Sequence, residues 1–326
     1  MKVTKCNESQ RCRWRFVLET GCCLAVVFGI VWSLGRYSQR AKHEANATTC
    51  QGRLSQLSYG LGVFRRTFGT YPPTYITDAK GKPAHSWRIL VLPYVEMDDI
   101  FSQYDFQKEW NTPPNVQLQS ATQRPGGQIF LCPTLDCPLK NRTTYLAVER
   151  PADLPSLVKP AMVLSSSNGQ LLLIEDHSAV IHWMEPVDLN SDALLTFARN
   201  PDSSTLLGPH RQGLQYVTDA GRYDGVLARG VEEDEVKRLL GLNMPPATLE
   251  PSQQEKVRLM RILGERLHGS SPRRDRLVAA LLLGQLGFQT PLARELLQQA
   301  LQDNDPAVRK AAKLSLEKLP PFKQNG

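Results

Sequence analysis

The stretch from Phe16 to Phe68 constrains the fold more than any other part of the chain. Residues 16–35 are almost entirely apolar, with Glu19 and Thr20 as polar exceptions near the start, and a bilayer-spanning helix needs about 20 such residues. Further on, the apolar residues thin into a seam spaced by three or four: Leu54, Leu57, Leu61, Phe64 and Phe68. That spacing places them on one helical face. We predict one long helix, membrane-spanning first and amphipathic afterwards.

Composition excludes two classes of protein. Of the 326 residues, 41% are hydrophobic and 22% are charged, which is typical of folded rather than disordered chains. The net charge is +7, but no basic run interleaves with aromatic residues, so we expect no nucleic-acid partner.

Charge around the apolar run predicts its orientation. Five basic residues precede it, and three follow it closely: Arg36, Arg40 and Lys42. This bias favours a cytoplasmic N-terminus and an extracytoplasmic, periplasmic body. No small-residue cleavage site closes the run and no second spanning run follows, so we expect a retained, single-pass helix in the cell (inner) membrane.

Three of the seven cysteines follow the apolar run: Cys50, Cys132 and Cys137. The chain has no pair of C-x-x-C units, so a structural zinc site is not expected. Outside the cytoplasm a disulfide is chemically stable. We predict that Cys50 pairs with Cys132 or Cys137. A zinc site made by the latter two with a histidine is the weaker alternative.

Beyond the helix, the sequence predicts a sheet and then more helices. Leu171–Ile174, Ala179–Trp183 and Leu214–Thr218 are short β-prone runs separated by turns. Such a sheet needs the amphipathic helix to cover one side. The fold class is therefore α+β, with a long N-terminal helix packed on an antiparallel sheet.

The C-terminal part is predicted to be all-α. Three amphipathic helices cover Asp275–Gly287, Pro291–Gln302 and Pro306–Leu319, and the segment from Asp305 to Arg309 resembles the start of a HEAT-repeat helix. One repeat buries little by itself. We expect it to lean on the helices of 231–267, on the sheet domain or on another subunit, and its apolar faces to form core rather than a binding groove.

Ordered motifs along the body support a family resemblance. Their positions are Pro72, Pro73, Trp87, Arg88, Pro93, Tyr94, Asp105, Trp110, Trp183, Pro186, Asp188, His210 and Asp219. Over roughly residues 16–227, the chain resembles a bacterial family of membrane-anchored, pilin-like (PulG-like) proteins labelled a domain of unknown function. The resemblance implies a pseudopilin-like fold and no established reaction.

The resemblance also suggests a role for Glu19. In pilins, a glutamate near the start of the apolar helix aids assembly by meeting a neighbouring subunit's N-terminus. The pilin pattern has it fifth, whereas Glu19 is fourth from Phe16. The alternative is that Glu19 lies at the membrane interface and pairs with Arg15 one turn earlier.

The best chemical constellation is Glu175-Asp176-His177 with His182. Metal sites use such residues, but the two histidines are five positions apart and would point to opposite faces of a strand. Common hydrolase and phosphate-binding motifs are absent from the sequence. We predict a non-enzyme without cofactor or metal.

The predicted division is a basic tail (1–15), a transmembrane helix (16–35), a pilin-like domain (36–227), a helical connector (228–270), HEAT-like helices (271–319) and a tail (320–326). The predicted function is a structural or interaction protein of a secretion- or pilus-type assembly. Its partners would be the bilayer and other envelope proteins or itself. Alternatives are an adaptor that binds through its helical repeat, and an anchored metal-dependent hydrolase using His177 and His182.

Overall fold

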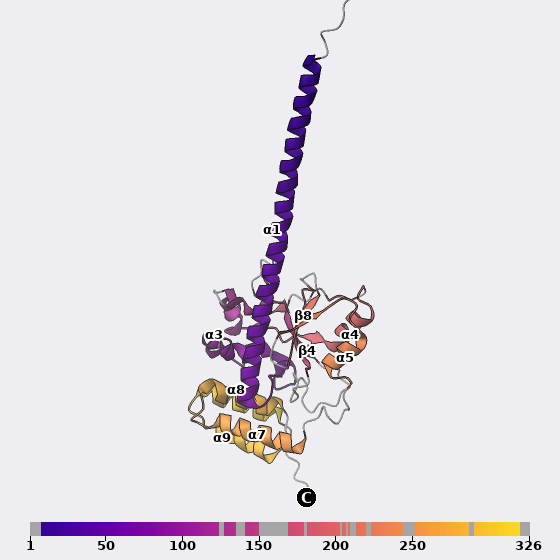
Figure 1. Cartoon of the computed structure of the whole chain (residues 1–326). Coiled ribbons are helices and arrows are strands. Elements are labelled where there is room, and N and C mark those ends of the chain that lie inside the picture. The colour runs from indigo at the N-terminus through magenta and orange to yellow at the C-terminus, as the bar shows by residue number, and fades with distance from the viewer. Residues whose placement is uncertain are drawn as a thin grey trace, which may run out of the picture. The chain divides into compact units, whose positions relative to one another are not determined.

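The computed structural model describes residues 8–123, 127–134, 141–149, 169–178, 181–202, 204–206, 208, 213–219, 223–243, 252–286 and 290–319 (Figure 1). The chain divides into two compact units, residues 1–48 and residues 49–326, and each is described by itself.

The first unit consists of the N-terminal part of helix α1, whose bounds are Glu8–Phe68. The side chains of residues 8–24, Glu19 included, lie outside the described part, so the predicted spanning segment is described only from residue 25. There its large apolar side chains are exposed: Val26, Val27, Phe28, Ile30, Val31, Trp32, Leu34 and Tyr37. Among the described residues, no helix has the length and apolar character needed to cross a membrane.

The second unit contains the last turns of α1, residues 49–68, here called the stem. All five seam residues of the stem are fully buried, which confirms the prediction of an amphipathic helix. The stem ends where Gly69 adopts φ +78° and its N–H donates to the carbonyl of Arg65 at 2.8 Å. Glycine takes this left-handed conformation without the Cβ clash that other residues meet.

Small elements follow the stem. An Asp78 carboxylate oxygen accepts the N–H of Lys80 and of Lys82 at 2.8 Å each and so closes the turn between β1 and β2. The elements are β1 (Tyr75–Thr77), β2 (Pro83–Ser86), α2 (Trp87–Val91), η1 (Leu92–Tyr94), α3 (Asp98–Gln103), η2 (Asn115–Gln123) and η3 (Gly127–Phe130).

The main sheet has five strands in the order β7–β4–β5–β8–β9. All neighbours are antiparallel except β4 and β7. The strands are β4 (Tyr145–Glu149), β5 (Leu171–Glu175), β7 (Leu189–Asn190), β8 (Leu214–Thr218) and β9 (Tyr223–Leu227). Strands β5 and β8 confirm two predicted runs.

The third predicted run, Ala179–Trp183, contains a strand that lies outside the main sheet. Of its described residues, Ile181–His182 form strand β6, which pairs with β3 (Arg142–Thr143) in a separate two-stranded sheet. Residues 179–180 lie outside the described part.

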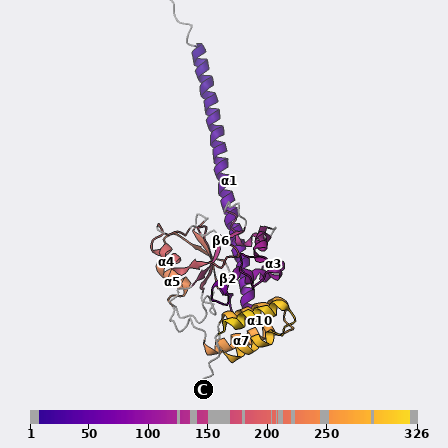
Figure 2. The same ribbon diagram turned by 180° about the vertical axis from the view of Figure 1, so that it is seen from behind.

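The sheet separates two cores, as the alternation of side chains along β4 shows. Tyr145 and Ala147 belong to the core that contains the stem, whereas Leu146 and Val148 belong to a second core. Successive strand residues point to opposite faces, which accounts for the division. Helices α4 (Ser191–Arg199) and α5 (Glu233–Leu240) cover the second face, and Figures 1 and 2 show them across the sheet from α1 and α3.

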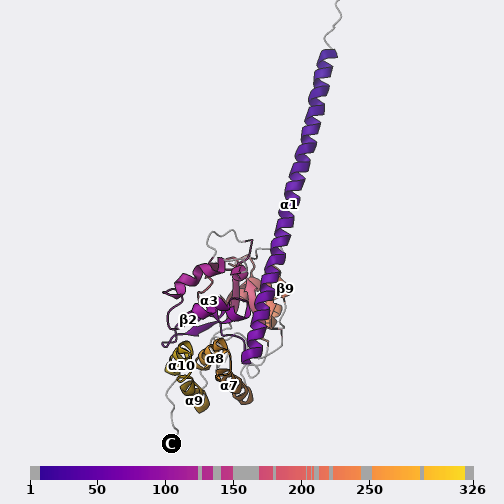
Figure 3. The same cartoon turned by 90° about the vertical axis from the view of Figure 1, so that its left-hand side faces the viewer.

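The C-terminal part is helical as predicted. Its helices are α7 (Gln253–Leu267), α8 (Arg273–Gln285), α9 (Pro291–Ala300) and α10 (Pro306–Lys318). Asp305 caps α10 by accepting the N–H groups of Ala307 and Val308, and Pro306 occupies the first turn. In Figure 3, α8 and α10 lie toward β2, and α7 and α9 lie below them, on the side away from β2.

These helices share a core with the stem. One buried cluster runs from Leu54 on the stem to Val308 on α10. The Nε of Arg266 donates to the carbonyl of Thr67 at 2.9 Å, and the Gln285 side chain accepts the N–H of Thr77 at 2.9 Å. The helical repeat therefore packs against the stem and the sheet part of its own chain, which is one of the three predicted arrangements.

Candidate functional site

Three motif residues meet in a buried ion pair. The guanidinium of Arg88 donates from Nη2 to Asp188 Oδ1 at 2.8 Å, and both side chains are fully buried. The same oxygen accepts the indole N–H of Trp87 at 3.2 Å and the backbone N–H of Ala147 at 2.8 Å. Asp188, which directly precedes β7, therefore joins that part of the chain to α2 and to strand β4.

Burial has the largest effect on the pKa values of this pair. It raises the pKa of Asp188 to about 6, although Arg88 and the N–H donors favour the carboxylate. It also lowers the pKa of Arg88 from its usual value. The charge of Glu149 also acts on Asp188 and that of Glu185 on Arg88, while both side chains of the pair have zero exposure to solvent. The pair organises the fold rather than forming a reactive centre.

The predicted histidine constellation does not converge. The ring of His182 lies 5.0 Å from that of Trp110 and stacks beside Trp183, and its Nδ1 accepts the N–H of Met184 at 3.2 Å. Burial lowers its pKa to about 4. His177 instead contacts Glu175. The structure thus places the two histidines in different environments, with Trp110 and Trp183 as packing anchors.

A cluster of sulfur and carboxylate atoms forms where the stem meets β5. The Sγ atoms of Cys50 and Cys132 are 2.7 Å apart, and both cysteines are fully buried. Glu175, also fully buried, completes a group whose ligand atoms all lie within 4.8 Å of one another, the one such metal-sized group among the described residues. The structure therefore brings together two of the three cysteines predicted to pair. Cys137 lies outside the described part.

His177 lies beside the Glu175 carboxylate of this cluster. Its Nε2 lies 3.3 Å from Glu175 Oε1. Burial alone would lower the pKa of His177, but hydrogen bonds with Cys132 and Glu175 and their charges raise it to about 9. The contact with Glu175 therefore favours the protonated form of this imidazole.

The other motif positions lie in structural contacts. Pro72, Pro73 and Pro93 are buried. The Tyr94 hydroxyl donates to Asp275 Oδ1 on α8 at 3.0 Å. The Asp219 carboxylate accepts the N–H of Gln170 at 3.0 Å. Pro186 is half-buried before β7. His210 lies outside the described part.

Sequence reasoning missed the residue that organises the loop after Asp105. The buried Asn115 accepts the Asp105 N–H at 2.8 Å, and its amide donates to the carbonyls of Asp105 and Lys108 at 2.8 and 3.0 Å. One asparagine in a polar loop gives no periodic signal, so only the fold reveals this role.

Two segments match known families. Residues 39–167 match the family described as "Protein of unknown function (DUF1559)". Residues 260–323 match HEAT repeats. No curated protein and no solved structure matches the chain. The first match contains both Cys50 and Cys132 and ends before Trp183 and Asp188, so it covers less than the 16–227 expected from the motifs.

A second buried histidine, His85, predicts how stability depends on pH. His85 is 2% exposed, and its Nδ1 lies 2.9 Å from the Tyr104 hydroxyl. Burial, with the nearby charge of Lys318, lowers its pKa to about 4. The folded state favours the neutral ring, so this contribution is present above the unfolded pKa near 6.5 and is lost as pH falls toward 4. We expect the free energy of unfolding to fall by about 3 kcal/mol over that window.

Urea unfolding at several pH values checks this expectation. His85→Gln should flatten that part of the pH profile, whereas His268→Gln, at an exposed position, should leave it unchanged. Equal profiles for wild type and His85→Gln would contradict the assignment to His85.

Proposed function

We propose that this chain is a membrane-anchored, pilin-like structural protein. In this proposal the apolar part of α1 sits in the bilayer with the N-terminus in the cytoplasm. Residues 49–326 form an extracytoplasmic body that assembles with other copies or other envelope proteins, as a pseudopilin does in a secretion- or pilus-type apparatus.

The uncovered apolar surface of α1 carries the proposal. Phe28 is 73% exposed, Val26 is 61% exposed and Trp32 is 57% exposed. Each apolar side chain in water costs about 25 cal/mol per Å² of its surface. A run of such residues on one helix needs an apolar environment, and a bilayer supplies it along the whole run. The basic residues that flank the run fit the cytoplasmic orientation of the N-terminus.

The way the body is built around the stem also supports this role. The seam residues of the stem are the centre of the larger core, which extends to α10. A body folded on the last turns of its anchor helix is the layout that the pilin resemblance implies. The match of residues 39–167 is compatible with it.

Membrane extraction tests the anchor. We expect the full chain to stay in the membrane pellet after alkaline carbonate washing, and alkaline phosphatase fused after Gly326 to be active. Val26→Arg with Val27→Arg should shift most of the protein to the soluble fraction, because arginine near a spanning helix's centre costs about 3 kcal/mol each. The matched control, Ser38→Arg with Gln39→Arg, should stay in the pellet. Release of the wild-type chain by carbonate would contradict the anchor.

Cross-linking tests the assembly. A photo-reactive residue at Phe28 should yield adducts with another protein, at twice the chain's mass if copies self-associate. The same residue at Gln39 should yield fewer. If Phe28 forms adducts with lipid alone, α1 anchors the chain but contacts no other protein there, and the pilin-like role is contradicted.

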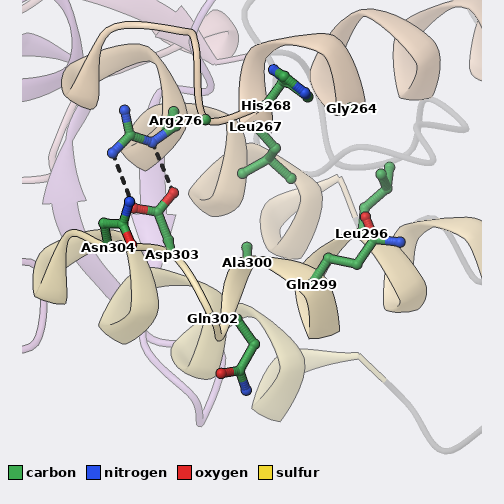
Figure 4. A pocket seen from close by; sticks show the side chains of 11 residues that line it. Gly264, Leu267, His268, Arg276, Leu296, Gln299, Ala300, Gln302, Asp303 and Asn304 are labelled. Carbon is green, nitrogen blue, oxygen red and sulfur yellow. Dashed lines mark hydrogen bonds and ion pairs between the residues drawn. The ribbon is translucent and has the colours of Figure 1, made fainter.

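The helical repeat offers a second candidate function, that of an adaptor. A hollow of about 330 Å³ lies between α7, α9 and the loop after α9, and Figure 4 shows Leu267, His268 and Leu296 at its walls. Arg276 closes one side through two bonds with Asp303, at 2.8 and 3.0 Å. If a partner binds there, Leu296→Arg should abolish its co-purification while membrane extraction stays unchanged.

A further inference from the structure

The contact between Cys50 and Cys132 joins two parts of the chain that are held independently. Cys50 lies on the stem, 82 positions before Cys132. Cys132 is fixed by its own N–H, which donates to the Thr144 side chain at 3.1 Å beside β4. Three residues after Cys50, Arg53 donates from Nη1 to the carbonyl of Leu131, the residue before Cys132. The two sulfur atoms are therefore aligned by backbone elements on both sides.

The charges around the two sulfur atoms disfavour a thiolate at this site. The hydrogen bond with Cys132, burial and the Glu175 carboxylate all raise the pKa of Cys50. Glu175 already has a neighbour of its own in His177, whose Nε2 lies 3.3 Å from Oε1. A thiolate would add a second anion to a fully buried site, and burying a charge without a partner is costly. An uncharged pair of sulfur atoms adds no further charge to the buried site.

We propose that Cys50 and Cys132 form a disulfide that staples the stem to the body. In this step the two thiols lose two protons and two electrons and form one S–S bond. The electrons pass to a disulfide of an exchange partner, which is reduced to two thiols. Exchange takes place before the stem is fully packed, because both sulfur atoms are inaccessible in the folded chain. The proposal rests on the extracytoplasmic placement proposed above, where disulfides persist.

The alternative is that the same sulfur and carboxylate atoms coordinate a zinc ion. Two thiolates on a tetrahedral zinc, each about 2.3 Å from the metal, lie roughly 3.8 Å apart. The observed separation is 2.7 Å. Zinc would also gather two thiolates and the Glu175 carboxylate at one buried ion, while His177 already pairs with that carboxylate. Distance and charge both favour the disulfide over the metal.

Peptide mapping of the full chain tests the proposal directly. Membrane-extracted protein is unfolded in excess N-ethylmaleimide without reductant and then digested. We expect the peptides that contain Cys50 and Cys132 to be joined and unlabelled, and to separate on reduction. Cys137→Ser should keep the link, whereas Cys50→Ser should lose it. Reduction should lower Tm by roughly 10 °C in the wild type and by nothing in Cys50→Ser.

Each contrary result overturns the staple. Labelling of both Cys50 and Cys132 in the wild-type protein would refute the disulfide. This result needs no variant, so the test still holds if Cys50→Ser folds poorly. A link to Cys137, or stoichiometric zinc that Cys50→Ser abolishes, would refute the disulfide as well. The phosphatase fusion is read in the same cells. Free thiols with an active fusion refute the staple alone, and free thiols with an inactive fusion refute the extracytoplasmic placement too.

Discussion

Asp188→Ala should lower the free energy of unfolding by about 3–5 kcal/mol, because it leaves a buried charge without its partner. Arg88 would keep hydrogen bonds to the Ser86 hydroxyl at 2.9 Å and the Tyr145 carbonyl at 2.8 Å, but no anion. The N–H groups of Trp87 and Ala147 would also lose their common acceptor. Urea unfolding of the detergent-solubilised full chain measures the loss.

An exposed ion pair in the same protein provides the matched control. Lys82 Nζ lies 3.4 Å from Glu109 Oε1, with side chains 67% and 51% exposed. Glu109→Ala should change the free energy of unfolding by no more than about 0.5 kcal/mol, because water screens such pairs. The double variant Arg88→Met with Asp188→Leu should recover part of the loss, since it removes both buried charges together. Equal effects of Asp188→Ala and Glu109→Ala would show that the buried pair is not a stabilising centre.

The sequence predicts the elements whose apolar pattern is regular. The stem seam repeats at three and four residues, and all of it is buried. Strands β5 and β8 and the last three helices lie within two residues of the predicted bounds. In each case the local pattern and the tertiary burial agree, so a local argument is sufficient.

What the sequence could not predict depends on distant parts of the chain. The second core forms because α4 and α5 cover the other face of the sheet, and the sequence pattern of the strands does not predict this packing. Arg88 and Asp188 are 100 positions apart, so their pairing follows from the packing of α2 against β4. Motif resemblance marked both residues without indicating that they touch. Cys50 had two candidate partners, and only the fold brings one of them, Cys132, within contact.

Phe68→Ala should lower the free energy of unfolding by about 3–5 kcal/mol, the usual cost of emptying a buried aromatic site. Phe68 is fully buried, 4.6 Å from the ring of Phe64 and 6.3 Å from that of Tyr94. Tyr59→Ala, on the exposed face of the stem at 65% exposure, is the control and should change stability by about 0.5 kcal/mol or less.

Hydrogen exchange extends this prediction to the helical repeat. Tyr94 joins the ring cluster of Phe68 to Asp275 on α8, and one buried cluster includes the stem and α8. A cavity at Phe68 should therefore raise amide exchange in α8 as well as in the stem, because elements that share a core open together. Tyr59→Ala should leave both protected. If α8 keeps its protection while the stem of Phe68→Ala exchanges freely, the HEAT-like helices form a unit that is stable without the stem.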